Sequence, residues 1–380
     1  MVTLSFGGFG LAATARNHLK AAPDSGFWSA VLGQFDHAEW VGGGFWDLIQ
    51  PSFMFMVGVS MAYSYVTRQR EGHSWARMFG HACWRAVVLI ALGIFLTSNS
   101  ARSTNWSFMN VLSQIGLAYP FLFLLWGRSP RVHATTAAGL LLGTWALYLA
   151  FSGPGIDPAK GAANLGVPAA WTQQHLAGVA PAWHKNANVG HAIDTHLLNA
   201  LPRREPFVFN AGGYQTINFI PSLATMLFGL MCGELLRSGR APTRKLTLLV
   251  LAGIGGIAGG LLWSSLGCPI IKRLWSPSWA LVSTGWCCLI LATLYGVIDI
   301  RRWRAWAFPL LVVGMNSIAV YCMEMTLKSW TAKNLQTHLG ENIFKILGAD
   351  VAPMVQSTMV GFVFWLVCWW MYRRKIFLRI

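Results

Sequence analysis

The sequence predicts an all-α, polytopic membrane protein with about nine or ten membrane-spanning helices in one bundle. Three observations lead to this prediction. Charged residues make up only 11% of the 380 positions, whereas soluble domains carry about 25%. Long apolar runs recur along the chain, in which 54% of the residues are hydrophobic. The 20 Trp and 22 Phe residues are typical of chains that place aromatic rings at membrane–water interfaces.

A helix needs about 20 mostly apolar residues to cross about 30 Å of hydrocarbon. Nine runs meet this need, in chain order: Asp47–Val66, Trp84–Thr97 (extended by Phe79–Cys83), Phe108–Trp126, His133–Phe151, Gln215–Leu236, Leu246–Leu266, Ser278–Ile298, Trp306–Leu327 and Pro353–Tyr372. A further apolar piece, Met1–Ala13, has no room to span. We interpret it as a re-entrant segment or as the end of a helix that starts upstream of Met1. No basic segment precedes it, so it does not resemble a signal peptide.

Basic residues predict the orientation, because short loops rich in Lys and Arg stay in the cytoplasm. One set of loops holds 17 of the 29 Lys and Arg residues: Arg68, Arg70, Arg77, Arg85, Arg128, Arg131, Arg237, Arg240, Arg244, Lys245, Arg301, Arg302, Arg304, Arg373, Arg374, Lys375 and Arg379. These loops and the C-terminus are predicted to face the cytoplasm, in the inner (cytoplasmic) membrane. Residues 14–46, 152–214, 267–277 and 328–352 then face outside. The prediction is one transmembrane domain over 1–380, with an extracytoplasmic loop at 152–214.

The net charge of +16 is explained by these helix ends, where basic residues set topology and meet anionic lipid. Nucleic-acid binding is therefore not expected. The seven Cys form no C-x-x-C pair, and the ten His form no H-x-x-x-H pair on a span. No metal site is predicted, and the cysteines are interpreted as small core residues. The glycines between Gly253 and Gly260 lie inside a span and predict close helix packing.

The strongest polar cluster enters the first span from the outer side. It contains Asp36, His37, Glu39 and Asp47, with a run of glycines at 42–44. A histidine titrates near neutral pH and can accept a proton from an attacking amine or hydroxyl. A carboxylate beside it fixes its tautomer and stabilises its cation. The alternative is a helix N-terminus with an acidic first turn, which also favours Asp.

Two further clusters place polar residues at membrane depth, where they are costly and so are functional candidates. One is Gly314-Met315-Asn316-Ser317 with Tyr321 and Glu324; Asn316 and Glu324 share one helix face at i and i+8. Helix–helix hydrogen bonding also explains Asn316 and Ser317. The other is the stretch from Asn210 to Asn218, where the long outer loop re-enters the membrane.

Motifs at these clusters form an ordered pattern. The first is a His, a Trp three residues later, a Gly, and an Asp-Leu-x-x-Pro segment; here it is His37, Trp40, Gly42, Asp47-Leu48 and Pro51. The others, in chain order, are Trp84-Arg85, Val111-Leu112 with Ile115-Gly116 and Tyr119, Thr216-Ile217-Asn218, Pro269-Ile270, Lys272-Arg273-Leu274-Trp275, and Gly314-Met315-Asn316-Ser317 with Val320-Tyr321. On this set the chain resembles the heparan-α-glucosaminide N-acetyltransferase family of transmembrane acyltransferases.

The resemblance implies transfer of an acetyl group from cytosolic acetyl-CoA to an amino sugar or other glycan acceptor across the membrane, without a metal. It makes His37 the essential residue and Asp47 its supporting carboxylate, by direct attack of the acceptor or through an acetyl-histidine. The resemblance implies that Asn218, Asn316 and Ser317 line the cavity. Lys272 and Arg273 would hold an anionic acceptor or structure the loop. Arg85 would bind a CoA phosphate or set the topology.

The chain also departs from the family pattern. The family's Asp-x-x-Arg-Gly motif in a first helix is absent, Gln114 stands where the family has Arg, and Asn210-Ala211-Gly212-Gly213 replaces the Asp-Pro-Glu-Gly of animal members. A small-solute transporter and a non-catalytic membrane scaffold remain as alternatives. A transporter would favour inverted repeats, which the sequence does not display. The lipid bilayer and a glycan acceptor are the expected partners, and a homodimer is left open.

Overall fold

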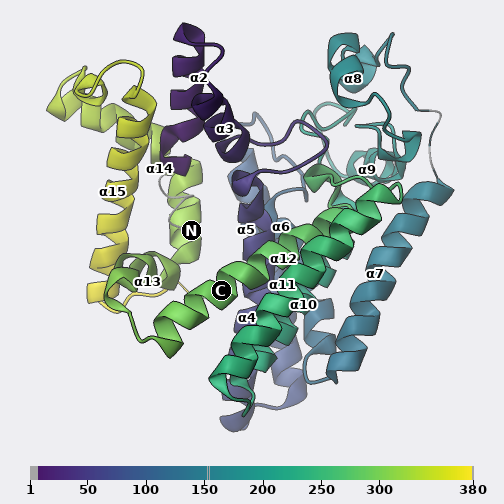
Figure 1. The fold of residues 1–380 in the computed structure, drawn as a ribbon, viewed down its shortest axis with the longest axis vertical. Coiled ribbons are helices and arrows are strands. Elements are labelled where there is room, and N and C mark those ends of the chain that lie inside the picture. Colours follow the sequence, from purple (N-terminus) through teal and green to yellow (C-terminus); the bar gives the residue numbers. More distant parts are fainter. Residues whose placement is uncertain (1–6, 152, 154, 379–380) are drawn as a thin grey trace. The chain divides into compact units, whose positions relative to one another are not determined.

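The computed structural model describes residues 7–151, 153 and 155–378 (Figure 1). Regular structure in this part of the chain is helical, apart from two isolated β-bridges. The predicted fold class is confirmed. Six helices of the described residues are long and apolar enough to span a membrane: Trp75–Ser98, Pro130–Ala150, Thr216–Arg237, Pro242–Ser265, Pro277–Ile300 and Ala352–Arg373.

The chain divides into two compact units, which are described separately. The first contains the residues up to Ala38, Gly43–Ile49, and the residues from Val297 onward. The second contains Glu39–Gly42 and Gln50–Gly296.

The second unit holds most of the helices. They are α4 (Ile49–Arg70), α5 (Trp75–Ser98), α6 (Val111–Leu125), α7 (Pro130–Ala150), α8 (Ala169–His175), α9 (Val189–Asn199), α10 (Phe219–Arg237), α11 (Pro242–Ser265) and α12 (Pro277–Leu294), which continues as a π-helical turn, Tyr295–Ile300. Helices α11 and α12 lie side by side, as do α5 and α6, and α10 packs against α6, α7 and α12 (Figure 1).

Two of the nine predicted spans, α4 and α6, fall short of the apolar-length criterion. Helix α4 has 22 residues, but Gln50, Ser52, Ser60 and other polar side chains interrupt its apolar run. Helix α6 has 15 residues, which at about 1.5 Å per residue gives about 22 Å. Asn110 caps its first turn by accepting the N–H of Ser113 at 2.9 Å, so the helix starts three residues later than predicted.

Glycines let helices of this unit approach closely, as predicted for the run in α11. A Cβ on Gly260 would lie 2.6 Å from the carbonyl oxygen of Ser278, and one on Gly253 would lie 2.6 Å from a Leu289 side-chain carbon. Gly58 of α4 is tighter still, because a Cβ there would lie 1.9 Å from the carbonyl oxygen of Met226 in α10. Gly255, by contrast, faces open space. The close-packing prediction is therefore confirmed for one face of α11.

The first unit contains α2 (Leu11–Ala21), α3 (Gly26–Phe35), α13 (Phe308–Met315), α14 (Ser317–Leu339) and α15 (Ala352–Arg373). Helix α15 packs against α13 and α14. The apolar start of the chain, Met1–Ala13, lies partly outside the described residues. From Gly7 its described part is one 3-10 turn that leads into α2, whose 11 residues are too few to span a membrane.

The predicted span Trp306–Leu327 is not one continuous helix. It is broken at Asn316, and the two helical pieces, Ala305–Met315 and Ser317–Leu339, are bent by 69°. Asn316 leaves helical geometry, with φ −127° and ψ 41°. Its side chain is 0% exposed and bonds outside its own helix, to the backbone of Ile376 and Leu378. The break is thus stabilised by a buried amide whose partners are distant in sequence.

Candidate active site

Asp47 is the centre of the polar cluster in the first unit. Its side chain is 0% exposed. One carboxylate oxygen lies 2.7 Å from Nδ1 of His37, and the other accepts the backbone N–H groups of Ala38 at 3.1 Å and Gly44 at 3.0 Å. A buried carboxylate is costly unless hydrogen-bond donors surround it, and these donors meet that need. The structure therefore brings His37 and Asp47 together.

The local fold explains why residues ten positions apart meet. Helix α3 ends at Phe35, and the chain returns through the glycines to a 3-10 turn, Phe45–Leu48. A Cβ on Gly44 would lie 2.5 Å from the carbonyl oxygen of Gly33, so only glycine fits this close return. Asp47 also accepts the Gly44 N–H at the start of this turn. The acidic first turn of the alternative interpretation is thus present and uses the same carboxylate, while the catalytic role of Asp47 stays a prediction.

The pairing defines the chemistry of the imidazole. The Nδ1 atom donates to the carboxylate, which fixes the tautomer and makes Nε2 the basic nitrogen. The His37 side chain is 43% exposed while its partner is fully buried. The Trp46 ring lies 6.4 Å from the imidazole ring, centre to centre. An accessible base held by a buried carboxylate is the arrangement that general-base catalysis requires.

Asn316 and Ser317 occupy the break between α13 and α14. The Asn316 amide donates to the carbonyl of Ile376 at 3.1 Å and its oxygen accepts the N–H of Leu378 at 3.1 Å. These contacts hold the C-terminal segment. That the two residues line an acceptor cavity stays a prediction, since the bonds of Asn316 serve the backbone.

A second polar cluster lies in the other unit, where three of the matched motifs meet. The Asn218 amide donates to the carbonyl of Arg273 at 2.9 Å, and the Arg273 guanidinium donates to the carbonyl of Gly212 at 2.9 Å. The guanidinium carbon lies 5.9 Å from the centre of the Tyr214 ring. The Asn218 carbonyl oxygen and the Arg273 Nε are buried without a partner in the described part of the chain. Arg273 therefore structures the loop, and it keeps one unsatisfied donor.

The segment after His37 is anchored in this same unit. Gly42 donates its N–H to the carbonyl of Ile270 at 2.8 Å, and its φ of +102° suits glycine. Trp40 is buried, and its indole N–H donates to the carbonyl of Trp183 at 2.9 Å. Lys272, on the following 3-10 turn, is also buried. The Trp and Gly of the first motif thus pack beside the Pro-Ile and Lys-Arg motif.

Sequence reasoning missed Lys185, which lies in the long loop with its side chain only 7% exposed. Its ammonium lies 4.7 Å from the centre of the Trp171 ring, whose indole N–H donates to Glu39 at 3.3 Å. Burial, with the nearby Arg273 charge, lowers the pKa of Lys185, against the opposing effect of Glu39. A lysine in a loop carries no motif, so the sequence held no signal for it.

The turn that carries Asn218 is held from two sides. The Thr216 N–H donates to both carboxylate oxygens of Asp194, at 3.2 and 3.0 Å. Gln114 donates to the carbonyls of Thr216 at 3.0 Å and Phe108 at 2.7 Å. Gln114, which stands where the family has Arg, therefore stabilises this turn through uncharged hydrogen bonds.

The Asp194 carboxyl gives a pH-dependent prediction. Burial raises its pKa from 3.8 to about 6, although the Thr216 bonds act in the opposite direction. Because the folded state holds the proton more tightly, this contribution to stability is complete below about pH 4 and is lost as pH rises through about 6. The loss is about 3 kcal/mol at about 1.4 kcal/mol per pKa unit.

Thermal unfolding in detergent should therefore depend less on pH between 4 and 7 in Asp194→Asn than in the parent chain. Asp157→Asn is the matched control, because that carboxylate is half exposed in the same loop. Parallel pH profiles for the parent and Asp194→Asn would contradict the buried-carboxyl interpretation.

The predicted span Trp84–Thr97 places Arg85 at the start of a span, but in the structure Arg85 lies inside helix α5. Ser74 accepts the N–H of Arg77 and caps α5, which begins at Trp75, so Arg85 lies in the third turn. Its guanidinium donates to the Tyr119 hydroxyl at 2.9 Å and lies 4.6 Å from the centre of that ring. Its Nε is buried without a partner among the described residues. Tyr119 and Arg85 belong to two matched motifs, which the α5–α6 contact joins.

A cavity of about 480 Å³ lies beside the Trp40 segment in the second unit, lined by Val41, His175, Val179, Gly267 and Pro269 among others. This volume falls in the range of about 300–1,000 Å³ that small-molecule sites occupy. Within the described residues, no group of three or more His, Cys, Asp and Glu side chains could hold a metal ion.

Comparison with known proteins agrees with the motifs. No family model matches the sequence. The chain is 25% identical to the heparan-alpha-glucosaminide N-acetyltransferase of Homo sapiens and 23% identical to that of Mus musculus, in each case over 91% of this chain. The alignments cover 56% of each relative, so the chain spans about half the length of the curated relatives it matches. The predicted resemblance is confirmed.

Proposed function

We propose that the chain is a membrane-bound N-acetyltransferase that moves an acetyl group from cytosolic acetyl-CoA to an amino sugar or related glycan at the extracytoplasmic face. The observation that carries the proposal is the contact of His37 with Asp47, at 2.7 Å, in a chain similar to enzymes named N-acetyltransferases. The apolar helices supply the membrane context. A transporter could use such a pair as a proton relay, so the likeness to enzymes named N-acetyltransferases is what favours catalysis.

The residues suit one-step transfer. The acceptor nitrogen attacks the thioester carbonyl, and His37 Nε2 takes the proton that the nitrogen loses. The C–N bond forms as the C–S bond breaks, and the CoA thiolate leaves with the electron pair. Asp47 stabilises the imidazolium that forms during the step. Transfer through an acetyl-histidine needs a second base to deprotonate the acceptor. The carboxylates near His37 are already hydrogen-bonded, so direct attack is favoured.

The test uses the full chain in proteoliposomes with acetyl-CoA carrying a labelled acetyl group. A panel of glucosamine, galactosamine and short amino-sugar oligomers is supplied on the opposite side of the membrane. The proposal expects label in an amide product. Label that stays in acetyl-CoA with every acceptor, in protein that binds CoA, would reject the activity; flux of an intact sugar without acetylation would favour a transporter.

Orientation is tested by single cysteines in a background lacking Cys83 and Cys322, the two cysteines that are not buried. Position 160 is 85% exposed in the long loop, and Arg128 is exposed in a loop rich in Arg. An impermeant thiol reagent should label Lys160→Cys in intact cells but not Arg128→Cys. The reverse pattern would overturn the proposed topology, in which the C-terminus is cytoplasmic.

Arg85 is proposed to bind a CoA phosphate with its unsatisfied Nε. A charge-assisted bond contributes about 1.5–3 kcal/mol, so Arg85→Gln should raise the KM for acetyl-CoA about tenfold or more. Tyr119→Phe is the control, because it removes the hydroxyl partner but leaves the charge. An unchanged KM in Arg85→Gln, with the protein folded, would leave Arg85 a structural link between α5 and α6.

A further inference from the structure

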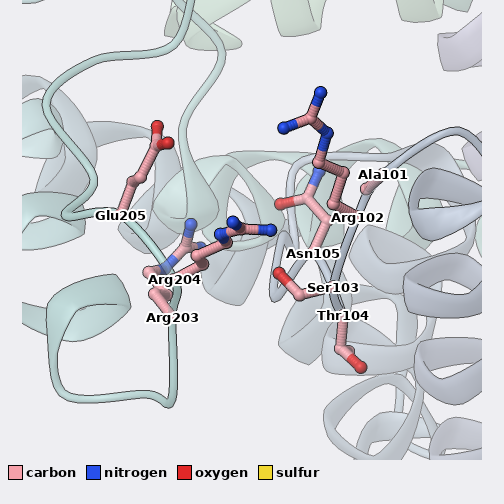
Figure 2. A pocket seen from close by; sticks show the side chains of 8 residues that line it. All are labelled: Ala101, Arg102, Ser103, Thr104, Asn105, Arg203, Arg204 and Glu205. Atoms are coloured by element: carbon pink, nitrogen blue, oxygen red, sulfur yellow. The ribbon is translucent and has the colours of Figure 1, made fainter.

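An arginine-rich pocket lies in the second unit, apart from the residues used above. Its volume is about 270 Å³. Figure 2 shows residues 101–105 on one side of the pocket and residues 203–205 on the other. The first wall begins three residues after the end of α5, and the second follows α9. The lining carries Arg102, Arg203 and Arg204 against a single carboxylate, Glu205, together with Ser103, Thr104 and Asn105.

The three arginines have different tasks. Arg203 is used by the fold, because its Nε donates to the carbonyl of Leu198 at 2.7 Å and its Nη2 donates to the carbonyl of Trp106. These bonds tie the two walls together. Arg102 and Arg204 are exposed, and neither makes an ion pair or hydrogen bond with the described residues. Glu205 does not neutralise either one. Two exposed guanidinium groups on opposite walls are thus left without an ion pair among the described residues.

Guanidinium groups match the oxygens of a phosphate in geometry and charge. Hydroxyl and amide groups from Ser103, Thr104 and Asn105 add hydrogen-bonding capacity at the same wall. A carboxylate ligand would use the arginines but has fewer oxygens to share among them. The excess of two positive charges and the polar wall favour a phosphate.

The surroundings indicate where such a phosphate would come from. Helix α5 is long and apolar enough to span a membrane, and the pocket lining begins three residues after its end. A helix of this length that spans a membrane ends in the headgroup region. The segments that flank the two walls in sequence carry exposed apolar side chains: Phe95 on α5, Leu197 on α9 and Val208 after the second wall. A basic pocket on segments with exposed apolar side chains is suited to a phospholipid.

We propose that this pocket binds the phosphate group of an anionic phospholipid, with Arg102 and Arg204 as the recognising side chains. The lipid phosphate neutralises the two guanidinium groups and joins the loop after α5 to the loop after α9. This site is independent of acetyl transfer, and neither arginine belongs to the proposed catalytic machinery.

The experiment measures binding of phosphatidylglycerol to the purified full chain in detergent, by native mass spectrometry over a lipid titration. Arg102→Gln/Arg204→Gln should weaken the affinity at least tenfold, because two charge-assisted contacts are lost. Glu205→Gln should strengthen it severalfold, because a repelling carboxylate is removed. The matched control is Arg128→Gln/Arg131→Gln, which removes two exposed arginines, one from the loop after α6 and one from the first turn of α7.

Thermal unfolding without added lipid should be nearly unchanged in all variants, since the replaced side chains make no internal bond. A second arm adds inorganic phosphate at constant ionic strength. Phosphate that displaces the lipid much less well than a second phospholipid does supports a lipid occupant, and phosphate that displaces it equally well would overturn that occupant in favour of a soluble phosphate ester. Equal loss of lipid affinity in the two double variants, or none in Arg102→Gln/Arg204→Gln, overturns the proposal.

Discussion

Replacement of His37 by alanine should abolish acetyl transfer while the protein stays folded. Loss of a general base typically costs about 10²- to 10⁴-fold in rate. The imidazole is 43% exposed, so its removal leaves no cavity in a core. The loss should therefore appear in kcat, with the affinity for CoA and the unfolding temperature in detergent nearly unchanged.

His37→Gln is the companion variant, because its amide can still donate to Asp47 but cannot take up a proton. Equal losses in His37→Ala and His37→Gln would assign the effect to proton transfer. Retention of more than a tenth of the parent turnover by His37→Ala, in protein that still binds CoA, would show that another group is the base. His18→Ala serves as a control for loss of a histidine in the same unit, since His18 stacks on Trp28 at 4.2 Å and has no contact with Asp47 among the described contacts.

Replacement of Asp47 by asparagine should reduce turnover less than removal of His37, by about 10- to 100-fold, and should also destabilise the fold. Asp47 accepts hydrogen bonds from His37, Ala38 and Gly44. An asparagine offers one acceptor oxygen and directs an NH₂ group at donors, so at least one buried N–H loses its partner. An unsatisfied buried group costs about 1–3 kcal/mol. The imidazole also loses the charge that fixed its tautomer and stabilised its cation.

These two effects separate in the measurement. The unfolding temperature reports the backbone bonds, and kcat reports the imidazole. If Asp47 positions and polarises His37, Asp47→Asn should lower kcat with little change in the KM for acetyl-CoA. A lower unfolding temperature with an unchanged kcat would reduce Asp47 to the helix-start role. Glu324→Gln is a suitable control, since that carboxylate lies on α14 and pairs with Lys328.

The apolar run lengths alone identified the all-helical membrane class and the sequence positions of nine helical segments, one of them broken at Asn316, because lipid leaves the backbone few alternatives to a helix. The apolar runs predicted the helix ends less accurately. A cap such as Ser74 moved the start of α5 ahead of the predicted run, and Asn110 shortened α6. The bend at Asn316 was beyond sequence reasoning, because its amide is satisfied by Ile376 and Leu378, some 60 positions away.

The candidate residues His37 and Asp47 could be chosen from their types and their motif, which the sequence carries in full. That His37 Nδ1 meets the Asp47 carboxylate was decided by the tertiary structure, through the close passage of Gly44 past Gly33. The tertiary structure likewise decided that Lys185 is buried against Trp171. It also decided that Arg102 and Arg204 lie on opposite walls of one pocket. The hydrophobicity of a run of residues can be read directly from its sequence. The burial and the relative positions of charged side chains depend on segments far apart in the chain, so only the folded structure reveals them.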